Sequence, residues 1–461
     1  MSYTRSSRPK APTPLVLGPA ELRIPAVLVA AALSASILLL PAAPAGAADD
    51  VEASAAAPTQ DAATWPQWRG PSRDGKVPGN DWPTDLKGLE QVWRLGDLGP
   101  SYSGPIVTAD TVFTTETIDK TYEKVTAYDR ATGELRWQKQ WPGAMKVPFF
   151  AAANGSWIRS TPVWDDETGT LFVGGIREVV VALDGATGKE LWRVDFPKSF
   201  ESAMPPFGFV CSPMVTGDHL YVEAGESMFK LDKRTGETVW RAGPFTDGEM
   251  GETGSFSSPV LATVAGREQL LVQSRTHLRG LDPADGGVLW AQEVPSFRGM
   301  NILTPAPWGD GIFTSTYKNA SYFFRVEPTS DPAKPFAVEL AWQSKPQAYM
   351  SSPVLLDGAA YLHLGNGRLT ALDLANGEQH WTSKPFGKYW SMAVQGNRIL
   401  ALDNGGELIL IEADPAELKI LDRRSIADAE TWAHVAVSGD EVVVRELHGL
   451  SVWRWGTTPE G

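Results

Sequence analysis

The chain has 461 residues, more than one ordinary hydrophobic core supports, which predicts either several domains or one domain built from repeats. Its formal net charge of −14 opposes binding to phosphate backbones and anionic lipid surfaces, so we expect no nucleic-acid partner. The single cysteine, Cys211, excludes an intramolecular disulfide. Stability must therefore come from the packed core.

The N-terminus has the pattern of an export signal. Basic residues precede the apolar run IPAVLVAAALSASILLL, which is followed by the small-residue stretch APAGAAD. This pattern predicts a signal peptide over residues 1–47 and a periplasmic or extracellular protein with no membrane span after cleavage. The run is also just long enough for an uncleaved anchor, which is the alternative. Residues 48–64 lack bulky apolar side chains and predict a disordered spacer before a single domain over residues 65–461.

A short pattern recurs in the chain: an Asp, a Gly four residues later and a Trp eight residues later. In the copy ALDGATGKELW, a β-branched run leads into the Asp and the Trp lies on the returning segment. The Asp accepts hydrogen bonds from turn N–H groups and the Gly supplies a positive φ, so each copy predicts a β-hairpin that closes on a Trp packed between neighbouring units. The five copies comprise Asp129, Gly133, Trp137, Asp184, Gly188, Trp192, Asp232, Gly236, Trp240, Asp282, Gly286, Trp290, Asp373, Gly377 and Trp381.

Strands that begin at a proline, such as CSPMV and SSPVL, precede the hairpins. Together with two weaker relatives near Ser391 and His434 they define eight units of four strands. This rhythm predicts an all-β fold, an eight-bladed β-propeller of four-stranded antiparallel blades. The last unit is one strand short, whereas residues 89–95 have the pattern of an outermost strand without a unit of their own. We expect this N-terminal strand to complete the last blade and close the ring.

The repeated A-L-D-x-x-T-G-x-x-x-W pattern resembles the pyrroloquinoline-quinone (PQQ) repeat propellers over residues 65–461. The opening WPQWRGPSRDG is similar to the start of an exported bacterial subgroup of PQQ-binding-like repeat proteins. The resemblance implies two alternatives. Some members are quinoprotein dehydrogenases of alcohols or sugars, in which PQQ lies against a disulfide of adjacent cysteines and beside Ca²⁺. Others, such as the propeller lipoprotein of the outer-membrane β-barrel assembly machinery, are scaffolds without a cofactor.

The cysteine count favours the scaffold over the dehydrogenase. No adjacent cysteine pair exists, and no recognisable set of metal ligands accompanies the repeats. We therefore expect a monomeric binding or assembly module with no cofactor and no catalytic activity. A PQQ-dependent oxidoreductase that uses PQQ and calcium is the alternative.

The loops that lead into the proline-led strands gather on one face of such a propeller, and the first three are long and rich in aromatic residues. We expect residues three or four positions before the repeated proline to lie near the channel mouth. There they predict an aromatic and polar face for a protein partner, a small molecule or a sugar, and packing between blades is the other interpretation of each. These candidates are Tyr102, Arg159, Phe256, Asn301, Tyr349, Trp390 and Trp432.

The remaining polar groups predict no chemistry. Cys211 is expected to be a small buried group rather than a nucleophile. The two arginines of RGPSRDG lack the Gly-rich strand-to-helix context of a phosphate site. Three histidines lack metal-ligand spacing and three loop glutamates match no calcium-binding loop; these are His277, His363, His448, Glu201, Glu249 and Glu252.

Overall fold

The structure is a computed structural model, and the residues that it describes all belong to the unit Pro58–Gly461. The predicted signal peptide, most of the predicted spacer, Glu249 and Glu252 lie outside the described residues. The described residues are 63–79, 82–149, 152, 155–245 and 254–456.

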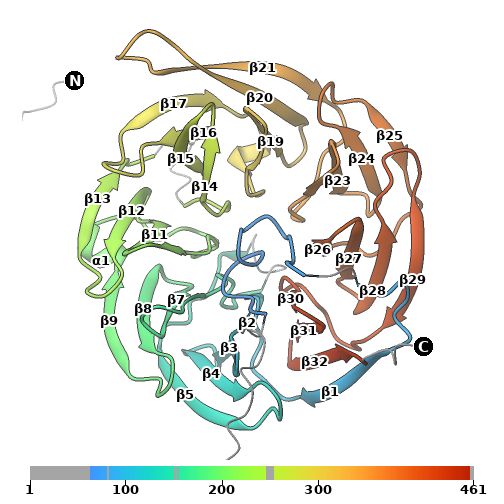
Figure 1. The fold of residues 1–461 in the computed structure, drawn as a ribbon. Coiled ribbons are helices and arrows are strands. Elements are labelled where there is room, and N and C mark those ends of the chain that lie inside the picture. The colour runs from blue at the N-terminus through green and yellow to red at the C-terminus, as the bar shows by residue number, and fades with distance from the viewer. Residues whose placement is uncertain (1–62, 80–81, 150–151, 153–154, 246–253, 457–461) are drawn as a thin grey trace, which may run out of the picture. The chain divides into compact units, whose positions relative to one another are not determined.

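Eight separate sheets of four antiparallel strands follow one another around a ring, which confirms the predicted eight-bladed β-propeller (Figure 1). In each blade the first strand is innermost and the fourth lies on the circumference. The strands of the first four blades are β2 (Ile106–Val107), β3 (Thr111–Ile118), β4 (Tyr122–Asp129), β5 (Leu135–Pro142), β6 (Val163–Asp165), β7 (Thr170–Gly175), β8 (Val179–Asp184), β9 (Glu190–Asp195), β10 (Met214–Thr216), β11 (His219–Ala224), β12 (Ser227–Asp232), β13 (Thr238–Ala242), β14 (Val260–Val264), β15 (Arg267–Gln273), β16 (His277–Leu281) and β17 (Val288–Glu293).

The second half of the ring repeats this arrangement, and it includes the fifth and seventh units, whose hairpins lack the Asp-Gly-Trp pattern. Its strands are β18 (Ala306–Trp308), β19 (Gly311–Ser315), β20 (Ser321–Pro328), β21 (Phe336–Ser344), β22 (Val354–Leu356), β23 (Ala359–His363), β24 (Leu369–Asp373), β25 (Gln379–Thr382), β26 (Trp390–Gln395), β27 (Arg398–Asp403), β28 (Glu407–Glu412), β29 (Lys419–Ser425), β30 (Ala436–Ser438), β31 (Glu441–Glu446), β32 (Gly449–Trp455) and β1 (Leu89–Leu95).

Helical structure is sparse in the described part of the chain. It includes a short α-helix, α1 (Phe196–Phe200), and a 3₁₀ turn at Phe297–Gly299. No helix among the described residues is long and apolar enough to cross a membrane.

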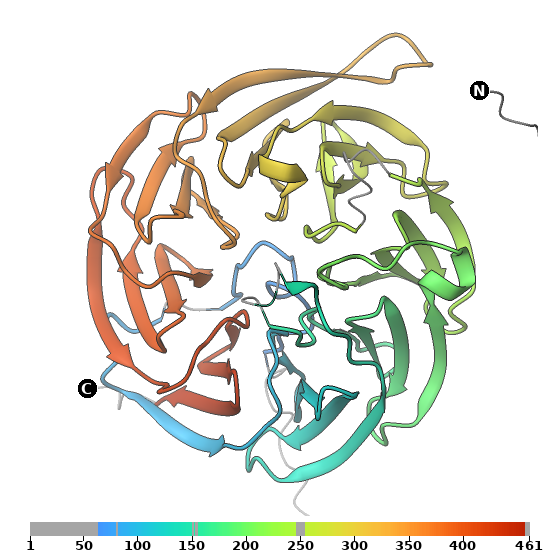
Figure 2. The ribbon, with the colours of Figure 1, turned by 180° about the vertical axis from the view of Figure 1, so that it is seen from behind.

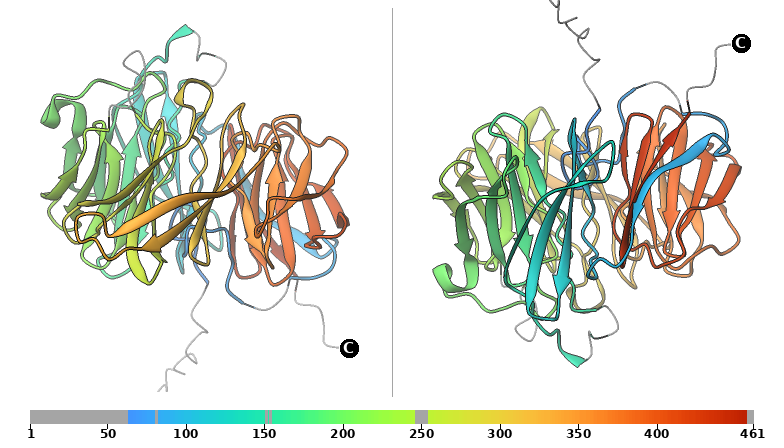
Figure 3. Two further views of the ribbon diagram at one scale, coloured as in Figure 1. Left: turned by 90° about the horizontal axis from the view of Figure 1, so that it is seen from above. Right: turned by 90° about the horizontal axis from the view of Figure 1, so that it is seen from below.

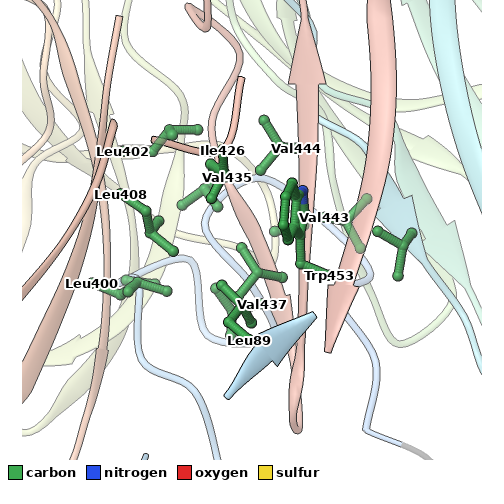
Figure 4. Packing of buried hydrophobic residues seen from close by; sticks show 14 of the residues in the cluster. Leu89, Leu400, Leu402, Leu408, Ile426, Val435, Val437, Val443, Val444 and Trp453 are labelled. Carbon is green, nitrogen blue, oxygen red and sulfur yellow. The ribbon is translucent and has the colours of Figure 1, made fainter. Parts of the chain in front are cut away.

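The ring is closed by β1, as the sequence predicts. This strand pairs antiparallel with β32, from Leu89 opposite Trp455 to Leu95 opposite Leu450. Leu89 lies in a buried cluster with Val437 of β30 (Figure 4). Because strands from both ends of the domain complete one blade, the last sheet has no missing outer strand that would leave an edge open to association.

The core lies between blades rather than inside one of them. One buried cluster, for example, joins Ile106 and Phe113 of the first blade to Leu171 and Val181 of the second. The arrangement of the blades gives the reason (Figure 3), because each sheet turns one face to the sheet before it and the other face to the sheet after it. Neighbouring blades therefore stabilise each other, as expected for repeat proteins.

The Asp-Gly-Trp hairpins form as the sequence predicts. In the second blade, the Asp184 carboxylate accepts the N–H of Thr187 at 2.8 Å, and Gly188 has a φ of 70°. The Gly188 N–H donates to the backbone carbonyl of Asp184 at 2.8 Å and closes the turn. The turn thus needs both an acceptor side chain and a residue that tolerates positive φ.

Four of the five repeat Trp side chains pack against the hairpin of the next blade, whereas Trp290 donates from Nε1 to Gln269 Oε1 of its own blade at 2.6 Å. The indole of Trp137 lies over Gly188 and donates from Nε1 to the carbonyl of Gly185 at 2.8 Å. Trp192 does the same to Gly236, with its Nε1 3.1 Å from the carbonyl oxygen of Lys233. The fixed spacing of Gly and Trp therefore joins successive blades through contacts between repeats.

A hollow at the loop face of the ring

A hollow of about 160 Å³ lies at the centre of the ring, where the loops preceding the innermost strands converge. Aromatic and other apolar side chains predominate on its walls, with several hydroxyl groups and one cation among them. The described lining residues are Trp68, Tyr102, Arg159, Phe207, Val210, Ser212, Phe256, Ser258, Met300, Ile302, Thr304, Met350, Ser352, Tyr389 and Trp432.

The lining follows a regular rule in all eight blades. The residue three positions before the repeated Pro, or before Met392 and Val435, which replace it in the last two blades, lines the hollow. Side chains alternate in direction along an extended segment, so residues one and three positions before the proline share one side. The residues at the third position are Tyr102, Arg159, Val210, Phe256, Ile302, Met350, Tyr389 and Trp432.

This rule separates the seven sequence candidates. Tyr102, Arg159, Phe256 and Trp432 line the hollow together. The other three candidates, which stand in other registers of their loops, do not line it; they are Asn301, Tyr349 and Trp390. The sequence predicted residues either three or four positions before the proline. Residues at these two positions lie on opposite sides of an extended segment, so the prediction included residues that point away from the hollow. Whether any of the seven binds a ligand stays a prediction.

The three candidates outside the hollow have other contacts. The amide of Asn301 is buried and donates to the carbonyl of Val294 at 2.9 Å. The ring of Trp390 is fully buried and stacks on His363 with centroids 5.1 Å apart. Tyr349 lies in a neighbouring groove, where its ring is 5.3 Å from that of Tyr317.

Three of the residues one position before the proline, Thr161, Ser212 and Ser258, have a structural task. Their hydroxyl groups accept backbone N–H groups from the preceding blade, as when Thr161 Oγ1 accepts from Gly104 at 3.0 Å. Ser212 Oγ and Ser258 Oγ accept in the same way, each at 3.0 Å, from Thr161 and Ser212. These hydroxyls tie blades together around the channel. The residues three positions before the proline differ in chemistry from blade to blade, so they give the wall of the hollow its varied chemical character.

Three aromatic rings form one wall of the hollow. Trp432 stacks on Tyr389 with centroids 5.2 Å apart and an interplanar angle of 11°, and the ring of Tyr102 also contacts Trp432, with centroids 5.6 Å apart. The indole N–H of Trp432 is buried without an acceptor in the described part of the chain. Burial raises the pKa of Tyr389 to about 12 and also raises the pKa of Tyr102, so both phenols stay protonated. This wall offers ring faces and hydrogen-bond donors.

Arg159 places a positive charge in the hollow. Its Nη2 donates to the carbonyl of Gly155 at 2.9 Å and its Nε to that of Trp157 at 3.2 Å. Burial lowers the pKa of Arg159 to about 10, which leaves the guanidinium charged at neutral pH. No carboxylate of the described residues forms an ion pair with it. An anionic or carbonyl-rich group entering the hollow would therefore find an unneutralised cation.

The segment 63–79 passes through the centre of the ring (Figure 2), and its Trp68 is one of the residues that line the hollow. Trp68 of this segment donates from Nε1 to Thr304 Oγ1 at 3.2 Å. Arg73 donates to the carbonyls of Pro259 and Pro213, both at 2.9 Å, and Arg69 donates to the carbonyl of Pro353 at 2.5 Å. Two guanidinium groups thus join blades three, four and six at the axis.

This arginine function was missed by sequence reasoning, which considered RGPSRDG only as a phosphate site. Burial lowers the pKa of Arg73 to about 9 and of Arg69 to about 10, and both stay protonated at neutral pH. Their partners are backbone carbonyls at the starts of innermost strands, which no side-chain pattern marks. The only available signal was the placement of two arginines ahead of the first blade without a repeat of their own.

Several of the other polar side chains considered in the sequence contact backbone carbonyl groups of the propeller. Burial raises the pKa of the Cys211 thiol, and its Sγ lies 3.4 Å from the carbonyl oxygen of Ser255. Burial lowers the pKa of His363 to about 4, and its Nε2 lies 2.9 Å from the carbonyl oxygen of Gly387. His448 Nδ1 lies 3.0 Å from the carbonyl oxygen of Leu98. Among the described residues, no group of three or more His, Cys, Asp or Glu side chains is placed to hold a metal ion.

The hairpin repeat, the closure by β1 and the central hollow define the protein as a PQQ-repeat β-propeller. The chain belongs to the PQQ_2 family, described as outer membrane protein assembly factor BamB, whose sequence profile matches residues 123–383.

Two curated relatives carry the same name. The protein from Yersinia pestis is 26% identical over 316 residues, which cover 63% of this chain and 72% of the relative. The protein from Moranella endobia (strain PCIT) is 25% identical over 256 residues, covering 53% of this chain. The chain spans 62% of the length of that second relative.

Solved structures show the same fold at lower identity. BamB from Moraxella catarrhalis aligns with a TM-score of 0.56 and 17% identity, over 81% of this chain and 99% of that chain. A europium-containing methanol dehydrogenase aligns with a TM-score of 0.51 and 13% identity, over 85% of this chain and 98% of that chain. The fold is thus shared with proteins of both kinds that the resemblance implies.

The described walls of the hollow do not fit a quinone with a metal ion beside it. Calcium and similar hard cations take carboxylate, amide and carbonyl oxygens. Neither a carboxylate nor an amide side chain is among the described residues that line the hollow. The chain also has one cysteine, so no disulfide can lie against a quinone ring. The walls instead present ring faces, thioethers and one guanidinium.

Proposed function

We propose that this chain is an exported binding or assembly scaffold that holds a protein partner at the hollow on its loop face and catalyses no reaction. Membership in the BamB family supports this proposal, because the relatives from Yersinia pestis and Moranella endobia are named outer membrane protein assembly factors. The signal peptide that the sequence predicts over residues 1–47, with its basic start and apolar run, supports export to the periplasm or beyond.

The observation that carries the proposal is the chemistry of the eight residues three positions before the prolines. They comprise aromatic, aliphatic and methionine side chains and one arginine, Arg159. Aromatic residues, Met and Arg are enriched at the centres of protein interfaces, whereas a catalytic site needs a nucleophile, a base or a metal. This set favours contact with a partner over chemistry.

The size of the hollow also favours contact with a protein partner. Pockets that enclose whole small molecules have volumes of roughly 300–1,000 Å³. The hollow, at about 160 Å³, is smaller and suits one or two anchoring side chains of a partner. An apolar anchor seated there would contact Trp432 and Phe256, and a carbonyl or carboxylate beside it would reach Arg159.

The alternative is a PQQ-dependent dehydrogenase of alcohols or sugars. The europium-containing methanol dehydrogenase has the same fold, which is the reason to consider this class of enzyme. The donor set of the hollow opposes it, because no described lining residue supplies a carboxylate or amide oxygen to a metal ion.

The test is to add PQQ and Ca²⁺ to the purified protein, record the quinone absorption spectrum after desalting, and assay dye-linked oxidation of alcohols and sugars. We expect no retained quinone and no turnover. Stoichiometric PQQ with Ca²⁺-dependent oxidation would overturn the scaffold proposal. As a positive control, a quinoprotein dehydrogenase is loaded in parallel under the same conditions.

A further inference from the structure

A second depression lies beside the hollow, between the loops of the fifth and sixth blades. Its volume is about 540 Å³, and it shares no lining residue with the hollow. Tyr317, which follows β19, and Tyr349, which precedes β22, line it with ring centroids 5.3 Å apart. We call this depression the lysine groove, after the residues that line it with the tyrosines: Lys318, Lys345 and Lys388.

The charge of the lysine groove is opposite to that of the chain. The chain carries a formal net charge of −14, yet no Asp or Glu is among the described residues that line the groove. Lys318, Lys345 and Lys388 are exposed, and none of them forms an ion pair with a carboxylate of the described residues. A cluster of cations without counter-ions on an acidic protein attracts an acidic partner.

Aromatic contacts position two of the three lysines. The Lys318 ammonium lies 4.8 Å from the ring centroid of Phe297 and 5.2 Å from that of Tyr317. Lys318 also has a φ of 54°, an uncommon backbone conformation for a residue with a side chain. Lys388 lies 5.9 Å from the ring of Trp432, which belongs to the hollow. The ring faces hold these cations at the groove without neutralising them.

The floor of the groove is apolar. Ala348 and Leu364, both buried and both lining the groove, are joined by a β-bridge between the segment that leads into β22 and the end of β23. Pro346 and the two tyrosine rings add further apolar surface. The groove thus offers cations together with a surface on which apolar atoms can rest, and a small inorganic anion would use only the first of these.

We propose that the lysine groove binds an acidic segment of the partner polypeptide, whose carboxylates pair with Lys318, Lys345 and Lys388 while its apolar atoms rest on Tyr317 and Tyr349. The inference takes from the proposed function only that the partner is a protein, since the hollow and the groove have separate lining residues. It gives the scaffold two adjacent contacts of different chemistry, an apolar anchor site and an anion site.

The test measures fluorescence anisotropy of a labelled peptide of Glu, Leu and Gly during titration with the purified protein. We expect saturable binding that weakens as NaCl is raised to about 0.5 M, because salt screens exposed ion pairs. The variant Lys318→Glu/Lys345→Glu should weaken binding by about tenfold or more. The matched control Lys189→Glu/Lys120→Glu changes the net charge equally at exposed sites on other blades and should bind as the unmodified protein does.

Two further arms distinguish the sources of the anion. Inorganic phosphate and phosphatidylglycerol vesicles are titrated in the same buffer. Lysine-dependent binding of vesicles or phosphate without binding of the acidic peptide overturns the inference, as does peptide binding that both charge-reversed proteins weaken equally. If the glutamate variant melts at a lower temperature than the control, Lys318→Gln/Lys345→Gln replaces it and should still weaken peptide binding. A negative result in this test contradicts binding at the lysine groove only. Partner binding at the hollow is measured by a separate experiment.

Discussion

The indole of Trp137 in the first blade lies against Gly188 in the second, so close that a Cβ placed on Gly188 would come within 2.5 Å of Trp137 Cε3. The same contact recurs between later blades, as when Trp240 lies against Gly286. The Asp-Gly-Trp pattern is therefore a contact between repeats as well as a turn within one.

Gly188→Ala should destabilise the protein through two effects, a strained positive φ and a clash with Trp137. Gly217 has a φ of 52°, and a Cβ placed on it would meet nothing within 4 Å, so Gly217→Ala carries only the first effect. We expect the first substitution to cost about 1–3 kcal/mol more than the second, measured by urea unfolding. Equal costs would show that the Trp137 contact does not restrict this position.

Trp192→Ala should cost about 3–5 kcal/mol of stability, as for other large packed aromatic residues. It removes the contact with Gly236, the hydrogen bond to Lys233 and the ring contact with Phe172 at 5.6 Å. Leu191→Ala is the control, because the adjacent Leu191 is 48% exposed. A similar loss in both variants, or a change in partner affinity of folded Trp192→Ala, would contradict a purely structural role.

Arg73→Met should lower the free energy of unfolding by about 3 kcal/mol, because it leaves the buried carbonyls of Ser212, Pro213 and Pro259 without a donor. Arg73→Lys should restore only part of the loss, since an ammonium lacks the planar fork that reaches several carbonyls. Lys76→Ala, in the same segment but largely exposed, should have little effect. The measurement is the melting temperature by circular dichroism.

Glu178 predicts a dependence of stability on pH. Its carboxylate accepts the Gly225 N–H at 3.0 Å across a blade junction, and burial, with Glu226 nearby, raises its pKa to about 7. The folded state therefore holds this proton more tightly than the unfolded state does. Its stabilising contribution is complete below pH 4.5 and is lost as the pH rises through 7, by about 3 kcal/mol in all.

Glu178→Gln keeps an acceptor for Gly225 and removes the charge, so it should raise the melting temperature at pH 8 and change it little at about pH 4.5. Glu190 is the control, because its hydrogen bonds with Arg193 lower its pKa and give the opposite sign. Glu190→Gln should slightly lower the melting temperature at about pH 8. An effect of Glu178→Gln that is the same at both pH values would contradict the assignment.

The periodic part of this fold was predictable because its cause is local. Asp184 and Gly188 form a turn from their own neighbours, and β-branched runs mark the strands on either side. The closure by β1 was also predictable, because an outer-strand pattern without its own unit had one vacant place in the ring. Even the fifth and seventh blades, which lack the hairpin pattern, keep their strand rhythm.

The candidate site was only partly predictable, because it depends on the direction of side chains in irregular loops. Tyr102 and Phe256 were found from their distance to a proline, but Asn301 and Tyr349 lie one residue out of register and point elsewhere in the fold. Arg69 and Arg73 bind carbonyls that belong to other blades, and such contacts leave no local pattern. Met350 and Ile302 line the hollow, yet in sequence they are ordinary apolar residues.

The most direct test of the central claim is site-specific photo-crosslinking in the cells that produce the protein. A photoreactive phenylalanine replaces Phe256 or Met350 in the hollow, and Leu191 on the circumference as the control, and adducts are identified by mass spectrometry. The scaffold proposal predicts a discrete protein adduct from both hollow positions and none from Leu191, and this adduct should decline in the Trp432→Ala background. Crosslinks from Leu191 with none from the hollow would contradict it.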